Sequence, residues 1–173
     1  MTVPLPAPRT PGRYRISVVC LGNICRSPMA DVVLNARVAG AGLDDRVTVV
    51  SAGTGDWHVG DAMDHRAAAL LTDQGYDASR HRAQQVLARW LDEHDLVLAM
   101  DADNLADLGA LAGGAADGER LRAFRDFDPE GPGDVPDPYY GGDAGFRDVL
   151  AMVERTADEI VAGLAGLTGV VSD

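Results

Sequence analysis

The sequence predicts an α/β fold with three layers, in which a central four-stranded parallel sheet is flanked by helices. Apolar strand-like segments alternate with helical segments along the chain, as in proteins built from β-α-β units. The strand-like segments are apolar on both faces, which is typical of a parallel sheet buried between helices. A length of 173 residues suits one domain of this kind.

The first strand, loop and helix are clearly marked. Residues 14–20 (YRISVVC) are expected to form a strand, because β-branched and other apolar side chains gather toward its end. A short loop follows. We expect the first helix to have Ser27 as its N-cap and Pro28 at its first position, and to end at Gly40.

The same alternation continues through the rest of the chain. The clearest helical periodicity lies in the last helix, where apolar residues recur at i, i+3, i+4 and i+7 from Phe146 to Leu164. A long loop rich in Pro, Gly and Asp spans 126–143, and such loops often carry function. The other expected elements are strands at 47–50, 96–100 and 121–124, and helices at 62–74, up to about Glu93, and at 102–111.

These elements form one domain with short tails. We expect a flexible N-terminal tail at 1–13, which holds four prolines, a single domain at 14–168 and a C-terminal tail at 169–173. The first residues lack the apolar core of a signal peptide, and no apolar run approaches the length of a membrane span. A cytoplasmic location is therefore expected, with leaderless export left open.

Charge and cysteine content exclude several classes of protein. The formal net charge is −12, whereas nucleic acids and anionic membranes attract basic surfaces, so neither partner is expected. Cys20 and Cys25 are the only cysteines, too few for a cystine framework or for a structural zinc site made of cysteines. We expect no metal and no cofactor.

The two cysteines lie in the loop between the first strand and the first helix, CLGNICRSP at 20–28. Ligands of open α/β sheets bind at such strand ends, and successive backbone N–H groups at a helix N-terminus bind anions. Gly22 allows close approach of the backbone and Asn23 tolerates a left-handed conformation. The loop is therefore predicted to bind a phosphate group.

The side chains at the two ends of this loop add chemistry. Arg26 offers a planar pair of donors to two oxygens of a tetrahedral anion. The same positive potential favours the thiolate form of Cys20, with Ser27 as a neighbouring hydroxyl. The loop has neither the Gly-Lys-Ser/Thr of a nucleotide-binding loop nor G-x-G-x-x-G. Nucleophilic displacement at phosphorus through a cysteinyl-phosphate intermediate is therefore the predicted reaction.

The motif C-x5-R-S, with Gly-Asn inside it and Pro after it, resembles the phosphate loop of the low-molecular-weight protein tyrosine phosphatases. Four further segments resemble the family in the same order: SAGT at 51–54, HRA at 81–83 with Gln85 in register, MD at 100–101 and DPYY at 137–140. Several motifs in order are far more specific than C-x5-R alone. The resemblance implies hydrolysis of phosphotyrosine proteins with release of inorganic phosphate, by a monomer or weak dimer.

The resemblance also implies a role for each site residue. Cys20 is the nucleophile, Arg26 binds phosphate, and Asp137 protonates the leaving phenolate and later activates water. Residues implied in phosphate binding are Leu21, Gly22, Asn23, Ile24, Cys25 and Ser27. Residues implied in support of the loop are Ser51, His81 and Asp101. Residues implied in the substrate cleft are Trp57, His58, Tyr139 and Tyr140.

Simpler interpretations remain open for several of these residues. Asp137 is one of several acidic residues in its loop, and Asp101 is also a natural N-cap. Cys25 is either a packing residue or, as the family supports, a thiol that forms a reversible disulfide with Cys20. Trp57 is either a core residue or a wall of the cleft. Tyr139 and its neighbour are also candidate modification sites.

Rival functions are disfavoured by particular residues. Arsenate reductases that share this loop need further downstream cysteines, and none follows Cys25. Protein-arginine phosphatases carry Thr where this chain has Ile24, which suits an aromatic ester better. A phosphate-binding module without turnover would not need Cys20, Arg26 and Asp137 together. A flavin-binding domain would have no task for the thiol and the guanidinium.

Overall fold

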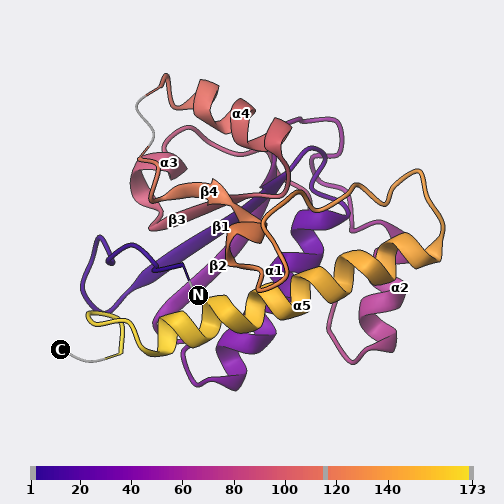
Figure 1. The fold of residues 1–173 in the computed structure, drawn as a ribbon. Coiled ribbons are helices and arrows are strands. Elements are labelled where there is room, and N and C mark those ends of the chain that lie inside the picture. Colours follow the sequence, from indigo (N-terminus) through magenta and orange to yellow (C-terminus); the bar gives the residue numbers. More distant parts are fainter. Residues whose placement is uncertain (1–2, 115–116, 172–173) are drawn as a thin grey trace.

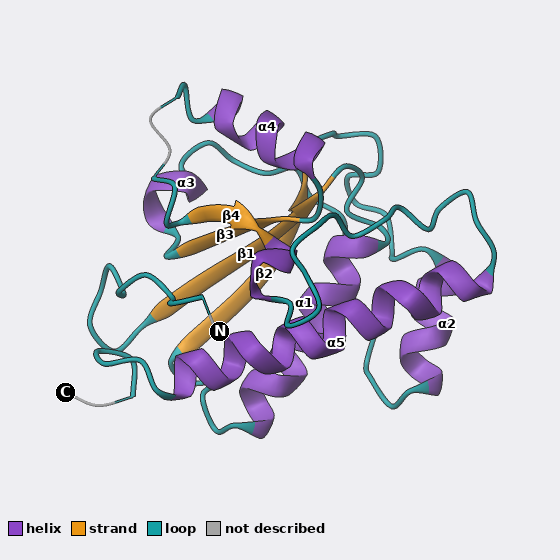
Figure 2. Ribbon diagram, in the orientation of Figure 1, coloured by secondary structure: helices purple, strands orange, loops and turns teal. Residues whose placement is uncertain are grey.

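The structure, a computed structural model, describes residues 3–114 and 117–171 and has the expected α/β fold. Its four parallel strands follow the order β2-β1-β3-β4, so the first strand lies inside the sheet. Figure 2 shows this sheet between two layers of helices. The strands are β1 (Tyr14–Cys20), β2 (Val47–Gly53), β3 (Leu96–Ala99) and β4 (Leu121–Ala123).

Two unequal layers of helices cover the sheet. Helices α1, α2 and α5 lie on one side, and α3 and α4 lie on the other (Figure 1). The carboxyl ends of β1 and β2 are paired at Cys20 and Gly53, so the loops that follow both strands leave the sheet side by side. The helices are α1 (Arg26–Gly40), α2 (His65–Asp73), α3 (Trp90–Glu93), α4 (Ala102–Leu111) and α5 (Asp143–Ala165).

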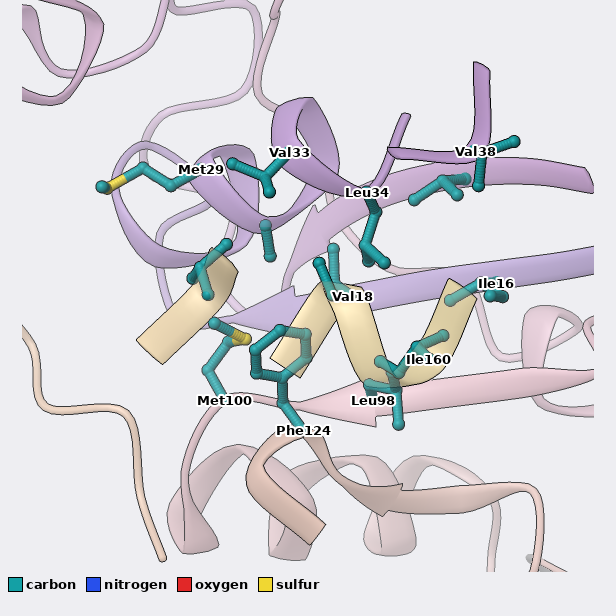
Figure 3. Close-up of a cluster of buried hydrophobic side chains, with 14 of the residues drawn as sticks. Ile16, Val18, Met29, Val33, Leu34, Val38, Leu98, Met100, Phe124 and Ile160 are labelled. Carbon is teal, nitrogen blue, oxygen red and sulfur yellow. The ribbon is translucent and has the colours of Figure 1, made fainter. Parts of the chain in front are cut away.

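The core consists of two clusters on opposite faces of the sheet, and successive side chains of β1 point alternately into one and the other. Ile16 and Val18 are fully buried against α1 and α5, and Val19 is buried on the opposite face with Leu108 of α4. Figure 3 shows the larger cluster, in which Phe124 packs with side chains of α1, α5 and the strands. Burying one such side chain contributes about 1.5–3 kcal/mol, so this packing fixes β1 and α1, the two elements that flank the loop.

The described part of the segment expected to be a flexible tail, residues 3–13, makes hydrogen bonds to the domain. The backbone N–H of Arg9 donates to Asp95 Oδ1 (2.6 Å), and its guanidinium Nε donates to the carbonyl of His94 (2.9 Å). The carbonyl of Pro6 accepts a hydrogen bond from the Tyr14 hydroxyl (3.0 Å). This segment therefore packs on the domain, and residues 1–2 lie outside the described part.

The C-terminal segment is also packed. Val170 is fully buried, and its carbonyl accepts a hydrogen bond from Arg46 Nη1 (2.7 Å). The N–H of Gly12 donates to the carbonyl of Gly169, which joins the two terminal segments. The expected tail at 169–173 is thus part of the domain up to residue 171, and residues 172–173 lie outside the described part.

Several element boundaries differ from expectation; for example, β2 continues to Gly53 and α2 begins at His65. The first helix begins at Arg26, with Cys25 at the N-cap and no capping side chain, whereas Ser27 was expected to cap it. Ser27 lies in the first turn, where its hydroxyl faces Cys20 instead. Phe124, the expected end of the fourth strand, begins a short 3-10 helix, η1 (Phe124–Phe127).

The carboxyl of Asp31, a residue of α1, makes the stability of the fold depend on pH. Asp31 accepts a hydrogen bond from Asn35 Nδ2 (2.6 Å). Burial raises the pKa of Asp31 from 3.8 to about 6, although the hydrogen bond from Asn35 acts against this rise. The folded state therefore binds the proton of the Asp31 carboxyl more tightly than the unfolded state does. The free energy of unfolding that this proton contributes at low pH is lost as pH rises through about 4 to 6.

We therefore expect Asp31→Asn to be more stable than the natural chain at pH 7.5, by about 1–2 kcal/mol after allowance for partial exposure. The gain should shrink at pH 5.5, where the natural carboxyl is largely protonated. Urea unfolding at the two pH values measures both differences. Asp44→Asn on the surface controls for the loss of one charge, and an equal gain in both variants would contradict the explanation.

Candidate active site

The loop after β1 depends on the backbone conformation of Asn23. Its φ of 57° lies in the left-handed region, which non-glycine residues adopt only when their surroundings hold them there. The Asn23 side chain donates to Ser27 Oγ (2.8 Å) and accepts from the backbone N–H of Gln84 (3.0 Å). Its carbonyl accepts from Nε2 of His81 (2.7 Å). Three bonds therefore fix the strained residue.

His81 acts on the loop as a neutral donor. Burial lowers the pKa of His81, an effect only partly opposed by the hydrogen bond to Asn23. A carbonyl oxygen can only accept, so the proton of the neutral ring lies on Nε2. The expected supporting position of His81 beside the loop is therefore present in the structure, while Gln84, a second partner of Asn23, was not expected from the sequence.

The end of β2 supports the loop through its backbone. The N–H of Thr54 donates to the carbonyl of Cys20 (2.9 Å), and the N–H of Gly55 donates to that of Leu21 (3.0 Å). A Cβ at Gly53 would lie 2.6 Å from the Leu21 carbonyl, so this contact requires glycine. This explains physically why the SAGT segment follows the second strand.

Ser51, by contrast, does not contact the loop as expected. Its hydroxyl is buried without a hydrogen-bond partner among the described residues, and its carbonyl accepts from Gln84 Nε2 (3.0 Å). Its influence on the loop is therefore indirect, through the glutamine whose backbone holds Asn23. The reason is its position along the strand, since Ser51 pairs with Val18 inside the sheet, two residues before the glycine that meets the loop.

The sulfur of Cys20 lies at the base of the loop. Its Sγ is 3.0 Å from Ser27 Oγ and accepts a hydrogen bond from the N–H of Asn23 (3.2 Å). Ser27 has a further acceptor at the carbonyl of Ala52 (3.3 Å), so its hydroxyl proton can turn between a strand carbonyl and the sulfur. Such donors stabilise negative charge on sulfur.

Arg26 is buried, and its guanidinium joins three parts of the chain. Nη1 donates to Asp101 Oδ2 (2.6 Å) and to the carbonyl of Val135 (3.1 Å). Burial alone would lower the pKa of Arg26, but the hydrogen bond to Asp101 and nearby negative groups hold it above its usual value. Asp101 also caps α4 by accepting from the N–H of Asn104 (2.7 Å), so both roles considered for it occur together.

Asp137 faces this guanidinium from the long loop before α5. Its Oδ2 lies 3.7 Å from Arg26 Nη2, and its Oδ1 accepts from the N–H of Tyr139 (3.1 Å). The loop is tied to the sheet by the N–H of Val135, which donates to the carbonyl of Met100 (2.8 Å). Among the acidic residues of this loop, Asp137 lines the same cleft as Cys20, whereas Asp134 accepts from the N–H of Ala102 instead.

A second tie to this loop comes from Arg66 in α2, which the sequence did not single out. Its Nη2 donates to the carbonyl of Tyr139 (2.9 Å) and to Asp64 Oδ2 (3.1 Å). The N–H of Asp64 donates to the carbonyl of Ile24 in the phosphate-binding loop (2.9 Å). Burial alone would raise the pKa of Asp64, but hydrogen bonds from Arg66 hold it below its usual value. Asp64 and Arg66 thus connect the two loops of the site.

The two loops enclose a cleft of about 320 Å³. Aromatic side chains form its mouth, and Trp57, 70% exposed, is a wall of the cleft and not a core residue. A larger cavity of about 760 Å³ lies against α1 and β2, away from the thiol. The smaller cleft is lined by Cys20, Leu21, Gly22, Ile24, Cys25, Arg26, Trp57, His58, Asp137, Tyr139 and Tyr140.

Two properties of the described ranges, 3–114 and 117–171, bear on the class of protein. No group of three or more His, Cys, Asp or Glu side chains is placed there to hold a metal ion. In the same ranges no helix combines the length and the apolar character that crossing a membrane requires. The titratable groups that line the cleft include the thiols of Cys20 and Cys25, the guanidinium of Arg26, the imidazole of His58 and the carboxyl of Asp137.

Comparisons with known proteins agree with this geometry. A low-molecular-weight protein-tyrosine-phosphatase of Streptomyces coelicolor is 47% identical over 154 residues, which cover 87% of this chain and 93% of that protein. The crystal structure of YfkJ from Bacillus subtilis has a TM-score of 0.82 at 32% identity and covers 88% of this chain and 94% of its own. The YwlE arginine phosphatase, at 23% identity, TM-score 0.78 and coverage of 88% and 97%, shares the fold alone.

The family model described as low molecular weight phosphotyrosine protein phosphatase matches residues 15–167, nearly the whole described domain. This range contains the phosphate-binding loop, the end of β2, the His81 segment and the Asp137 loop. The chain therefore belongs to the low-molecular-weight phosphotyrosine protein phosphatases, a family of phosphoric monoester hydrolases.

Proposed function

We propose that this protein hydrolyses phosphotyrosine monoesters in proteins through a phosphate ester of Cys20. The observation that carries the proposal is the meeting of Cys20, Arg26 and Asp137 in one cleft with aromatic walls. A phenyl ring fits between such walls, and the loop amides and Arg26 bind a dianionic phosphate. The aromatic mouth supports phosphotyrosine over phosphoarginine, and faster hydrolysis of phosphoarginine would overturn this choice.

In the proposed first step the Cys20 thiolate attacks phosphorus and the bond to the phenol oxygen breaks. Asp137 gives its proton to the departing oxygen, because a phenoxide of pKa near 10 leaves slowly without one. Arg26 and the loop amides stabilise the charge on the transferring oxygens. Ser27 and the N–H of Asn23, both in contact with Sγ, favour the thiolate before attack.

In the proposed second step water attacks the phosphorus of the Cys20 ester, and the S–P bond breaks. Asp137, now ionised, accepts a proton from the water, and the thiolate and inorganic phosphate are regenerated. The hydrogen bond from Ser27 stabilises the departing thiolate, as it does the attacking one.

We propose phosphotyrosine proteins as partners of a cytoplasmic monomer or weak dimer, with no nucleic-acid or membrane partner.

Cys25 is proposed to protect the nucleophile during oxidation. Both thiols line the cleft, and burial raises the pKa of Cys25 to about 12, so it remains a thiol while Cys20 reacts. Peroxide would convert the Cys20 thiolate to a sulfenic acid, and condensation with the Cys25 thiol would form a disulfide and release water. Phosphatase activity lost to peroxide should then return with dithiothreitol, and Cys25→Ser should lose this recovery. Equal recovery in both proteins would contradict the pairing.

Asp137→Ala tests the general acid. We expect kcat for phenyl phosphate to fall by about two to four orders of magnitude, because the leaving phenoxide no longer receives a proton. The rate for 2,4-dinitrophenyl phosphate, whose leaving group needs no proton, should fall far less in the first step. Asp134→Ala, in the same loop, is the matched control. A similar loss of kcat/KM, which reports the first step alone, for both substrates would contradict the role of Asp137 in leaving-group protonation.

Arg66→Ala tests the tie between α2 and the Asp137 loop. Without the bonds from Arg66 to Tyr139 and Asp64, the carboxyl should be poorly positioned. We expect about a tenfold slower hydrolysis of phenyl phosphate, with a much smaller effect for 2,4-dinitrophenyl phosphate. Arg89→Ala, at an exposed arginine directly before α3, is the charge-matched control.

The double variant of Arg66 and Asp137 separates positioning from general loss of structure. If Arg66 acts by positioning the Asp137 loop, then adding Arg66→Ala to Asp137→Ala should not change the ratio of the rates for phenyl phosphate and 2,4-dinitrophenyl phosphate. The kcat/KM values of the single and double variants for the two esters, which report the first step, measure this coupling. An independent, multiplicative loss on both esters would contradict a positioning role.

A further inference from the structure

A second cavity adjoins the candidate active-site cleft and has no part in the proposed chemistry. Its volume is about 250 Å³, and it lies between the loop after β2 and helix α4. Leu21 and Trp57 line both this cavity and the cleft, so the two spaces share a wall. We call the second space the outer cavity.

The lining of the outer cavity is mainly apolar. Leu111, 42% exposed at the end of α4, forms one side, and the buried side chains of Val86 and Leu108 contribute to the rest. Exposed apolar side chains gathered around a hollow mark binding surfaces. Among the described residues that line it, Asp107 alone carries a charge, and it is negative. The cavity therefore suits an apolar side chain and disfavours an acidic one.

Trp57 is held against the loop backbone although most of its surface is exposed. A Cβ at Gly55 would lie 1.9 Å from Cζ3 and 2.3 Å from Cε3 of the Trp57 ring. The ring therefore packs on Gly55, where any side chain would collide with it, so this contact requires glycine. An aromatic ring held in this way costs little entropy when a ligand packs against it.

We propose that the outer cavity is a substrate subsite that receives an apolar side chain lying within two residues of the phosphotyrosine. This proposal rests on the proposed function, because the phosphotyrosine ring must occupy the adjoining cleft. Consecutive Cα atoms of a peptide are about 3.8 Å apart, so a neighbouring side chain reaches across a wall shared by the two spaces. Burying a leucine side chain there would favour its peptide by about tenfold in kcat/KM.

The test compares phosphotyrosine peptides that carry Leu, Gly or Asp at each of the two positions before and after the phosphotyrosine. For the natural chain, we expect one position at which kcat/KM is about tenfold higher for Leu than for Gly, and lower still for Asp. Leu111→Asp should remove this preference by placing a charge in the cavity. Leu87→Asp is the matched control, because Leu87 is 43% exposed and lines neither space.

Hydrolysis of p-nitrophenyl phosphate, which has no neighbouring residue, should be the same in the natural chain and both variants. Equal kcat/KM for all peptides, or a leucine preference that survives Leu111→Asp, would overturn the subsite. A loss of preference that is equal in Leu111→Asp and Leu87→Asp would also overturn it. Absence of hydrolysis of any aryl phosphate by the natural chain would instead overturn the proposed function, and the subsite with it.

Discussion

The site depends on one buried cation. Arg26 carries a full charge in the interior, and a buried charge without partners would cost several kcal/mol. Its partners are the carboxyl of Asp101, the carbonyl of Val135 and, at 3.7 Å, the carboxyl of Asp137. These groups come from the start of α4 and from the loop before α5, while Arg26 itself begins α1. The requirement to satisfy one guanidinium thus brings together three segments far apart in the sequence.

Around this cation the phosphate-binding loop is fixed by its backbone. Asn23 adopts its left-handed conformation because Ser27, Gln84 and His81 bond it, and the glycine at the end of β2 lets the two loops meet. Backbone amides and one arginine create a positive site on a chain whose net charge is −12. The overall charge disfavours polyanions, whereas the proposed function has the local arrangement bind a single dianion.

The sequence predicted those features that depend on local patterns. The β1 strand, the loop motif and the C-terminal helix follow from apolar periodicity and from the spacing of Cys20 and Arg26. The N-cap was misassigned to Ser27, because local rules cannot show that its hydroxyl is directed to a sulfur seven residues earlier. The N-terminal segment was expected to be flexible, because its own sequence does not show that Arg9 bonds to residues more than eighty positions away.

Two further site residues show the same limit. Ser51 was expected beside the loop, but it pairs with Val18 inside the sheet, two residues before the end of β2. Arg66 gave no signal, because its partner Tyr139 lies 73 positions along the chain. Residues that act by holding two distant loops together become visible only when the fold is known.

The central claim is that Cys20 carries the phosphoryl group between substrate and water. The most direct test uses Asp137→Ala with 2,4-dinitrophenyl phosphate, whose first step needs no acid whereas the second still needs a base. We expect a burst of one dinitrophenolate per enzyme, and acid quenching followed by peptide mass analysis should find phosphate on Cys20. No burst should occur when Cys20→Ser is added. Phosphate on another residue, or full turnover by Cys20→Ser, would contradict the account.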